Sequence, residues 1–225
     1  PMKASFVIPV MNGSAYIAET IDSIVRQKLK DIEIVLVDDG SNDRTLDIIE
    51  YFMEKDKRIV LYKHEKNMGR SAARNTGIAN AKSDIILISD ADDISNPGRA
   101  TETVKYFKEN KEIDILTTRA QAIDSLGNVL GTLPTRPFQY DTVKKDKATY
   151  IVHSTMAFRK SVFDKVKYTE GDYSAHAIDD WKFQVDCYKA GFKFGYLNKT
   201  MAQYRVIPKI RDEKKILELK ELCLA

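Results

Sequence analysis

Short runs of apolar, mostly β-branched residues alternate with segments in which apolar residues recur every three or four positions. The first such pair is Phe6–Ile8 followed by Ile17, Ile21 and Ile24. An unbroken apolar run is typical of a strand buried on both faces, and the wider spacing is typical of a helix with one buried face. Further runs stand at Ile34–Val37, Ile59–Tyr62, Ile85–Ile88 and Ile113–Thr117. The alternation predicts an α/β protein with a mostly parallel central sheet flanked by helices.

The second half of the chain departs from this alternation. Two apolar stretches flank the turn-like Ser125–Asn128, which predicts a small antiparallel hairpin. Pro134–Ala148 is polar and shows no period, so we expect a loop there. Apolar spacing further on predicts a strand at Thr155–Phe158, helices at Ser161–Val166 and Asp179–Ala190, strands at Phe192–Leu197 and Met201–Val206, and a last helix at Glu213–Cys223.

Composition narrows the class of protein. The chain has 225 residues, a net charge of +3 and no block rich in Lys and Arg, so nucleic acid is not an expected partner. The aliphatic stretch Ile85–Ile88 is far shorter than the run of about 20 apolar residues that crosses a bilayer. Cys187 and Cys223 lack metal-ligand spacing, and a chain without a disulfide framework suits the cytoplasm.

Aspartates gather where two of the expected strands end. Asp38 and Asp39 follow the second strand, and Asp90, Asp92 and Asp93 follow the fourth. Open parallel sheets bind ligands beyond the carboxyl ends of their strands, and clustered carboxylates suit Mg²⁺ or Mn²⁺ with phosphate oxygens. Residues i and i+2 of an extended segment share a face, so Asp90 and Asp92 are expected to converge on one ligand. The alternative is that these carboxylates only cap the next helix.

Five motifs in this order resemble the family 2 glycosyltransferases, inverting enzymes of the GT-A fold that use nucleotide sugars. They are Phe6–Asn12, Val37–Ser41, Asn67–Gly69, Ala73–Gly77 and Ser89–Asp93. The resemblance runs from Phe6 to about Arg205 and implies a single domain over residues 1–225. Within it, residues 1–119 would bind the nucleotide sugar, residues 120–212 would bind the acceptor and hold the catalytic base, and residues 213–225 would form a C-terminal helix.

The resemblance also implies roles for single residues. Asp39 would hydrogen-bond the nucleobase, Asp90 would face the ribose, and Asp92 would bind the Mn²⁺ or Mg²⁺ that bridges the diphosphate. A carboxylate accepts well from the imide N–H of uracil, which agrees with the first of these roles. The nucleotide site would further be lined by Pro9, Val10 and Arg74.

Asp179-Asp180-Trp181 resembles the Glu-Asp motif of the same family. Asp180 matches the catalytic base that takes the proton from the acceptor hydroxyl, and Asp179 is the alternative. Trp181 is a candidate acceptor contact, because its ring stacks well on a sugar, although burial against the core is an equally ordinary use of a tryptophan.

Two positions depart from the family pattern. Met11 stands where the family often has Tyr, although its sulfur still packs against a base. No His follows Tyr204-Arg205, which removes a metal or phosphate ligand and makes Lys209 or Arg211 a candidate for the phosphate role.

The leading hypothesis is a metal-dependent inverting glycosyltransferase of hexosyl or N-acetylhexosaminyl type. It would move a sugar from a UDP-sugar to a hydroxyl of a glycan or lipid-linked acceptor in polysaccharide biosynthesis. The alternatives are a nucleotide-sugar-binding or inactive transferase domain, and a sugar nucleotidyltransferase, whose basic glycine-rich loop is missing at Asn12–Ser14. We expect the last helix to pack on the domain. A dimer contact, or a basic surface helix at the inner face of the membrane, is the other hypothesis for it.

Overall fold

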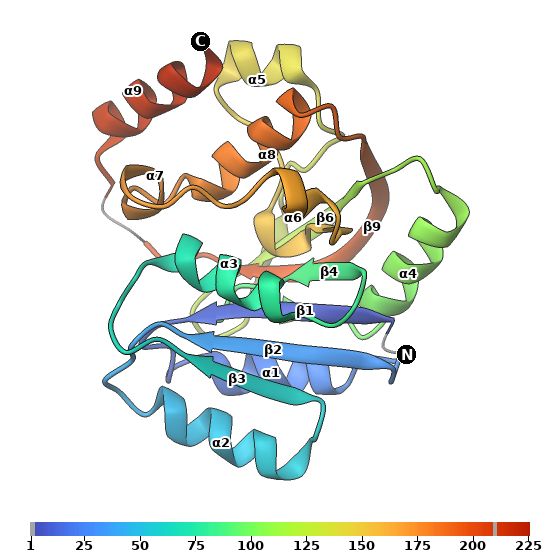
Figure 1. Ribbon diagram of the computed structural model, residues 1–225, viewed down its shortest axis with the longest axis vertical. Helices are drawn as coiled ribbons and strands as arrows, with labels where there is room; N and C mark the ends of the chain where they lie inside the picture. Colours follow the sequence, from blue (N-terminus) through green and yellow to red (C-terminus); the bar gives the residue numbers. More distant parts are fainter. Residues whose placement is uncertain (1–2, 209–210) are drawn as a thin grey trace.

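The computed structural model describes residues 3–208 and 211–225, and a single sheet runs through the middle of this part of the chain. Four parallel strands come from the first half, in agreement with the sequence prediction (Figure 1). They are β1 (Ala4–Val10), β2 (Ile32–Asp38), β3 (Ile59–Lys63) and β4 (Ile85–Ile88). Their apolar runs are long enough only for short strands. These side chains are nearly all buried in β1, β2 and β4, whereas in β3 only Ile59 is buried.

The second half of the chain extends the same sheet with antiparallel and parallel pairs. β8 (Ala157–Arg159) is antiparallel to β4 and to β6 (Ile115–Ile123), and β9 (Phe194–Arg205) is parallel to β6. β5 (Ile94–Ser95) pairs with β9, and β7 (Val129–Thr132) forms the predicted hairpin with β6. The strand order among the described residues is β3-β2-β1-β4-β8-β6-β9-β5, with β7 beside β6.

Helices cover both faces of the sheet. In β1, Phe6 and Ile8 belong to one buried apolar cluster and Val7 to the other, because successive side chains of a strand point to opposite faces. The first cluster is closed by α1 (Ile17–Val25), α2 (Thr45–Lys55) and α4 (Arg99–Glu109). The second is closed by α3 (Arg70–Asn80), α6 (Val162–Lys165) and α8 (Asp179–Lys189). The described part of the chain therefore has three layers, with the sheet between two layers of helices.

Gly77 lets α3 lie directly against the strands. A Cβ at this position would be 2.6 Å from Cγ1 of Val7 and 3.1 Å from Cγ2 of Val37, and both valines are fully buried. Glycine therefore permits an approach that any larger residue would obstruct. The close packing fixes the first turns of α3 beside the carboxyl ends of β1 and β2.

Two sequence predictions for the second half were wrong. The expected loop at 134–148 contains α5 (Tyr140–Asp146), whose Val143 is fully buried with Trp181 and Val185. The two expected strands over 192–206 are one strand, β9, because its pairing with β6 continues from Phe194 to Arg205 across two register shifts at the polar residues of its middle. Both differences come from tertiary contacts that the local pattern does not contain.

The last helix, α9 (Glu213–Leu224), packs back on the domain as its amphipathic spacing predicts (Figure 1). Ile216, Leu219 and Cys223 are buried, and the hydroxyl of Tyr173 donates to the carbonyl of Leu219 at 3.2 Å. No helix within the described ranges has both the length and the apolar content to cross a membrane. A role of α9 at a membrane surface or in a dimer stays a prediction.

Candidate nucleotide-sugar site

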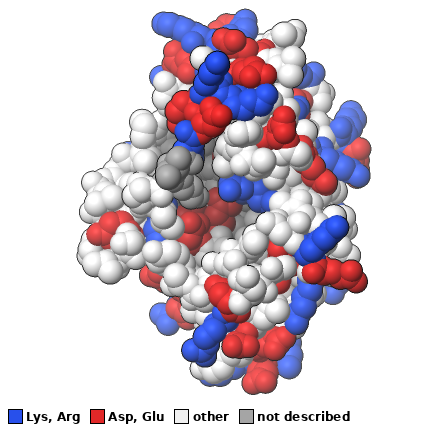
Figure 2. All heavy atoms as spheres, turned by 90° about the vertical axis from the view of Figure 1, so that its left-hand side faces the viewer, with Lys and Arg blue, Asp and Glu red and all other residues white. Residues whose placement is uncertain are grey.

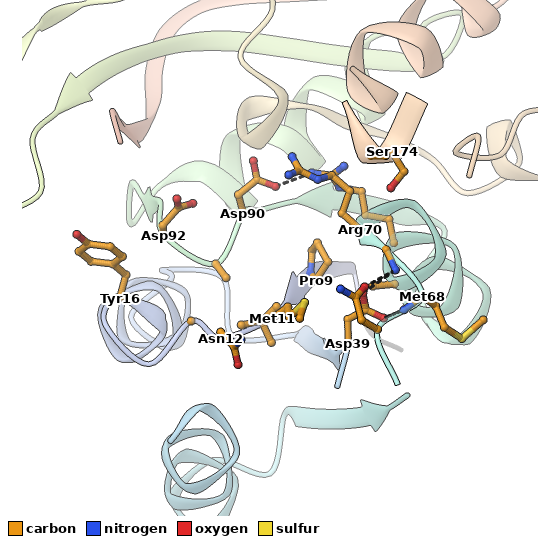
Figure 3. Close-up of a pocket in the computed structure, with 18 of the residues that line it drawn as sticks. Pro9, Met11, Asn12, Tyr16, Asp39, Met68, Arg70, Asp90, Asp92 and Ser174 are labelled. Carbon is orange, nitrogen blue, oxygen red and sulfur yellow. Dashed lines mark hydrogen bonds and ion pairs between the residues drawn. The ribbon is translucent and has the colours of Figure 1, made fainter. Parts of the chain in front are cut away.

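A pocket of about 730 Å³ opens where β1, β2 and β4 end, the edge at which the sequence predicts ligand binding. Figure 2 shows it as a hollow in the face of the molecule with acidic side chains inside. The strand ends contribute Pro9, Val10, Asp39, Asp90 and Asp92 to its wall, as predicted. Figure 3 shows that other parts of the wall come from the turn before α1, which carries Asn12 and Tyr16, from α3 and from the segment that carries Ser174.

Asp39 is buried at the floor of the pocket and is held by three donors. Its Oδ1 accepts from the backbone N–H of Met68 at 2.9 Å and from Nδ1 of His64 at 2.7 Å, and its Oδ2 accepts from the N–H of Gly69 at 2.8 Å. Nε2 of His64 lies 2.9 Å from the hydroxyl of Thr76, which donates to it when Nδ1 carries the proton. Each carboxylate oxygen accepts about two hydrogen bonds, so Oδ2 retains room for one more donor.

Asp90 and Asp92 both line the pocket, but not for the reason that the sequence suggests. The N–H of Asp93 donates to the carbonyl of Asp90 at 3.3 Å, so the segment is a turn instead of an extended strand end. Ala91, the residue between them, lines the pocket as well. In Figure 3, Asp92 lies toward Tyr16, whereas Asp90 makes an ion pair on the side of α3. Asp93 is buried outside the pocket wall.

The carboxylates of this edge fit a divalent cation only together with a ligand. Within residues 3–208 and 211–225, no three His, Cys, Asp or Glu side chains gather as a metal site. Asp90 is bound to Arg74, and Asp92 is the other pocket aspartate of the same turn. Mg²⁺ and Mn²⁺ commonly bind through one or two carboxylates plus substrate phosphates and water, which matches this wall.

Arg74 is buried in the pocket wall between two carboxylates. Its Nη2 is 2.8 Å from Oδ1 of Asp90, and its Nη1 is 2.5 Å from Oδ2 of Asp179. Burial acts to lower the pKa of Arg74, but Asp179 and Asp90 outweigh it and raise that pKa above the ordinary arginine value. The sequence predicts that Arg74 lines the nucleotide site, but no sequence pattern indicates that Arg74 also binds Asp179 at the start of α8.

The first turn of α8 holds the candidate base. Asp179 is fully buried, whereas Asp180 is half-buried and accepts from the N–H of Trp181 at 2.7 Å. Neither aspartate is part of the pocket wall. Burial raises the pKa of Tyr204, a wall residue, to about 12, and the negative charges of Asp90, Asp93, Asp92 and Asp180 act in the same direction. Asp180 directly follows Asp179, which pairs with the wall residue Arg74, so the candidate base lies one residue from the pocket wall's ion pair.

The Trp181 side chain is buried against the core, which is one of the two roles that the sequence allows for it. Its side chain is 6% exposed and packs with Val143, Val185 and Cys223, and Nζ of Lys220 lies 5.4 Å from the ring centroid. The ring is thus covered by α5 and α9, and a contact of Trp181 with an acceptor sugar stays a prediction.

Several pocket residues escaped the sequence reasoning. Tyr16, Arg70, Ser174 and Tyr204 all line the wall. For Tyr204 the sequence did offer a signal, because this residue belongs to the Tyr204-Arg205 pair of the family pattern. Met11 stands at the rim, 44% exposed. Of the two candidates for the phosphate role, Lys209 lies outside the described residues, and Arg211 is exposed and does not line the pocket.

Comparison with known proteins gives a consistent family. The sequence model described as Glycosyl transferase family 2 matches residues 5–167. An uncharacterized glycosyltransferase of Methanocaldococcus jannaschii is 33% identical over 194 residues, which cover 85% of this chain and 66% of that protein. Glycosyltransferase GlyG of Streptococcus pneumoniae is 27% identical over 215 residues, which cover 89% of this chain and 70% of GlyG. The chain thus spans about two thirds of the length of these relatives.

Solved structures show the same fold. Residues 1–349 of S. aureus TarS in complex with UDP match with a TM-score of 0.77 at 21% identity, covering 99% of this chain and 65% of that chain. The mannosyltransferase PcManGT of Pyrobaculum calidifontis, solved with GDP-Man and Mn²⁺, matches with a TM-score of 0.70 at 16% identity, covering 92% and 57%. The GT-A fold predicted from the sequence is confirmed.

A buried histidine lies behind the pocket. Nε2 of His153 is 2.8 Å from the hydroxyl of Tyr168, and its Nδ1 is 3.4 Å from Nε2 of Gln184. Burial, and next the positive charge of Arg74, lower the pKa of His153 from 6.5 to about 4. The folded protein therefore holds this imidazole in its neutral form at neutral pH.

This histidine makes stability depend on pH. Since its pKa is lower in the folded than in the unfolded chain, its contribution is complete above about pH 6.5 and is lost as the pH falls toward about 4. Measured by urea unfolding, the free energy of unfolding of the parent should fall by up to about 3 kcal/mol more than that of His153→Gln as the pH is lowered from about 6.5 to about 4. The loop variant His176→Gln should follow the parent. Parallel curves for the parent and His153→Gln would contradict the prediction.

Proposed function

The chain belongs to glycosyl transferase family 2, and from that premise we propose that it transfers a sugar from a UDP-sugar to an acceptor hydroxyl with inversion, using Mn²⁺ or Mg²⁺. The observation that carries the proposal is the arrangement of the pocket. A buried carboxylate with one open acceptor position lies at the end of β2, and a second aspartate, Asp92, lies on the wall after β4. The first suits a nucleobase and the second suits a metal-bound diphosphate.

The hydrogen bonds of Asp39 favour uracil over guanine. Two donors already occupy Oδ1 and one occupies Oδ2, so a single further N–H is accepted. Uracil presents one imide N–H on its pairing edge, whereas guanine presents an N–H and an amino group side by side. A guanine would leave one of these donors without a partner in the pocket, which costs about 1–3 kcal/mol. UDP and UDP-GlcNAc in the TarS structures agree with this choice, whereas PcManGT holds GDP-Man.

The leaving group is a diphosphate, and its charge needs compensation. Asp92 would hold the divalent cation, which when bound stabilises the negative charge that develops on the departing nucleoside diphosphate. Arg70 begins α3, lies on the pocket wall and is exposed, so it is available to a phosphate oxygen. It supplies the kind of charge that the missing histidine after Arg205 would otherwise provide.

Asp180 would act as the base on the acceptor side. The acceptor oxygen attacks the anomeric carbon as the bond from that carbon to the diphosphate breaks, and the hydroxyl proton passes to the Asp180 carboxylate. An ordinary carboxylate is a weak base for a sugar hydroxyl, so the proton moves late, when the new bond has largely formed. The one displacement inverts the anomeric centre.

The acceptor is proposed as a class only. A hydroxyl of a glycan or lipid-linked acceptor at the cytoplasmic face of a membrane, and a hexosyl or N-acetylhexosaminyl donor, are the classes we propose. Residues 1–119 contribute most of the pocket wall, and the part between Gly171 and Ala175 closes one side of it. This division supports a donor half at 1–119 and an acceptor half at 120–212.

Calorimetry with nucleotides tests the choice of donor. UDP with Mn²⁺ should bind about tenfold or more tightly than GDP, because the second guanine donor finds no acceptor. 3-Methyl-UDP lacks the imide N–H and serves as the matched control, with an expected loss of similar size. Equal affinities for UDP and 3-methyl-UDP would show that Asp39 does not accept a hydrogen bond from the imide N–H of uracil. A thermal-shift screen of UDP-sugars then identifies the sugar.

The metal assignment has its own test. Asp92→Ala should bind UDP in saturating Mn²⁺ no more tightly than the parent binds it in EDTA, because the bridging cation is lost. Asp47→Ala removes an exposed aspartate of α2 and should leave the metal effect intact. If Asp92→Ala keeps the affinity of the parent for UDP with Mn²⁺, the metal is held elsewhere.

The base assignment separates binding from chemistry. In Asp180→Asn the amide keeps the shape but accepts no proton, so transfer should fall by about 10²-fold or more while UDP affinity stays within about twofold. Asp179→Asn should reduce transfer less. Loss of affinity and turnover together would place Asp180 at the donor, and full activity in Asp180→Asn with loss in Asp179→Asn would move the base back by one residue.

A further inference from the structure

We infer that Arg74 is a positioning residue, which holds the start of α8, and with it Asp180, in a fixed place relative to the nucleotide pocket. The inference rests on the proposed function of Asp180 as the base. Sequence reasoning places Arg74 among the residues that bind the nucleotide, whereas the ion pairs of its guanidinium face two carboxylates of the protein itself.

The bridge joins distant parts of the chain. Asp90 belongs to the turn after β4, 16 residues from Arg74, and Asp179 opens α8, 105 residues from it. The Arg74 side chain is 3% exposed and that of Asp179 is 1% exposed. One buried cation therefore connects the donor side of the pocket with the first turn of the helix that carries the candidate base.

The bridge depends on the shape of the guanidinium. Nη1 donates a hydrogen bond to Asp179 and Nη2 donates one to Asp90, so one planar group holds the two carboxylates at a fixed separation. A lysine at this position is a single point charge on a flexible stem and does not reproduce that geometry. Oδ1 of Asp179 and Nε of Arg74 have no hydrogen-bond partner within the described residues, so this ion pair is the main compensation of the buried Asp179 charge.

The consequence falls on the neighbouring residue. Asp180 follows Asp179 directly. The amide of Trp181 donates to the Asp180 carboxylate at 2.7 Å, and the amide of Lys182 donates to the carbonyl of Ile178 at 2.9 Å to begin the helix. If Asp179 loses its cation, a buried carboxylate is left unpaired, and the first turn of α8 must shift or take up water to relieve it. A displacement of about 1 Å at a reacting group is enough to reduce a rate by about 10²-fold.

Arg74→Lys is the first test, because it keeps the charge. We expect kcat to fall about tenfold or more, with UDP affinity within about threefold of the parent. Amide hydrogen exchange at Trp181 and Lys182 should become faster, which reports the loosened first turn without any need for activity. Arg58→Lys is the matched control, since Arg58 also binds a carboxylate, that of Asp56, away from the pocket. It should leave kcat and the exchange of α8 unchanged.

Asp179→Asn approaches the same bridge from α8 and also covers the case in which Arg74→Lys does not fold. It should lower kcat and raise exchange at α8 to the same extent as Arg74→Lys. The double variant should be no slower than either single variant, because both changes break one interaction. Additive losses of kcat would overturn the bridge.

The outcomes separate this inference from the proposed function. Loss of UDP affinity at unchanged kcat in Arg74→Lys would make Arg74 a nucleotide ligand and overturn the positioning role. Unchanged exchange at α8 in both variants would overturn it as well. A parent that binds UDP but transfers no sugar would instead contradict the proposed transfer, and faster exchange at α8 in both variants would still support the bridge.

Discussion

Buried and half-buried carboxylates lie at the carboxyl edge of the sheet, and the groups that compensate them organise the rest of the site. Asp39 accepts hydrogen bonds from two backbone N–H groups and from His64, and Asp90 and Asp179 share the guanidinium of Arg74. A buried carboxylate without such partners would be strongly destabilising. Each compensation fixes the position of a different segment, so the charges of the pocket also define its walls.

Helix α3 contributes to most of these compensations. The N–H of Gly69 at its start meets Asp39, Arg74 in its second turn meets Asp90 and Asp179, and Gly77 seats the helix against β1. Gly69 has a φ of 92°, a left-handed conformation that glycine adopts without strain, and this lets the loop turn its amides toward Asp39. A change in the packing of α3 would therefore disturb the surroundings of Asp39 and the start of α8 together.

The sequence predicts the parallel half of the fold well and the second half less well, for one physical reason. Buried parallel strands are marked by their own apolar residues, and the turns that follow them carry the acids of the site, so Asp39, Asp90 and Asp92 were found. The helix α5 depends on burial of Val143 against Trp181, which lies outside any local window. His64 carries no motif either. It reaches Asp39 because β2 and β3 pair with Asp38 opposite Lys63, so only the register places the next residues of the two strands together.

The partners of the charged residues were harder to foresee than their locations. A run of aspartates after a strand indicates which edge of the sheet binds a ligand, but two buried acids and one arginine can pair in several ways that differ only in tertiary geometry. The observed pairing, in which Arg74 spans Asp90 and Asp179, ties the turn after β4 to the first residue of α8, a helix that is also buried in the second apolar cluster and contacts the short α7 (Asp172–Ala175) and α9. The apolar side chains of α8 hold the body of the helix in the core, whereas the ion pair links its first residue to the strand edge that lines the pocket, so this one link bears directly on the position of the neighbouring candidate base.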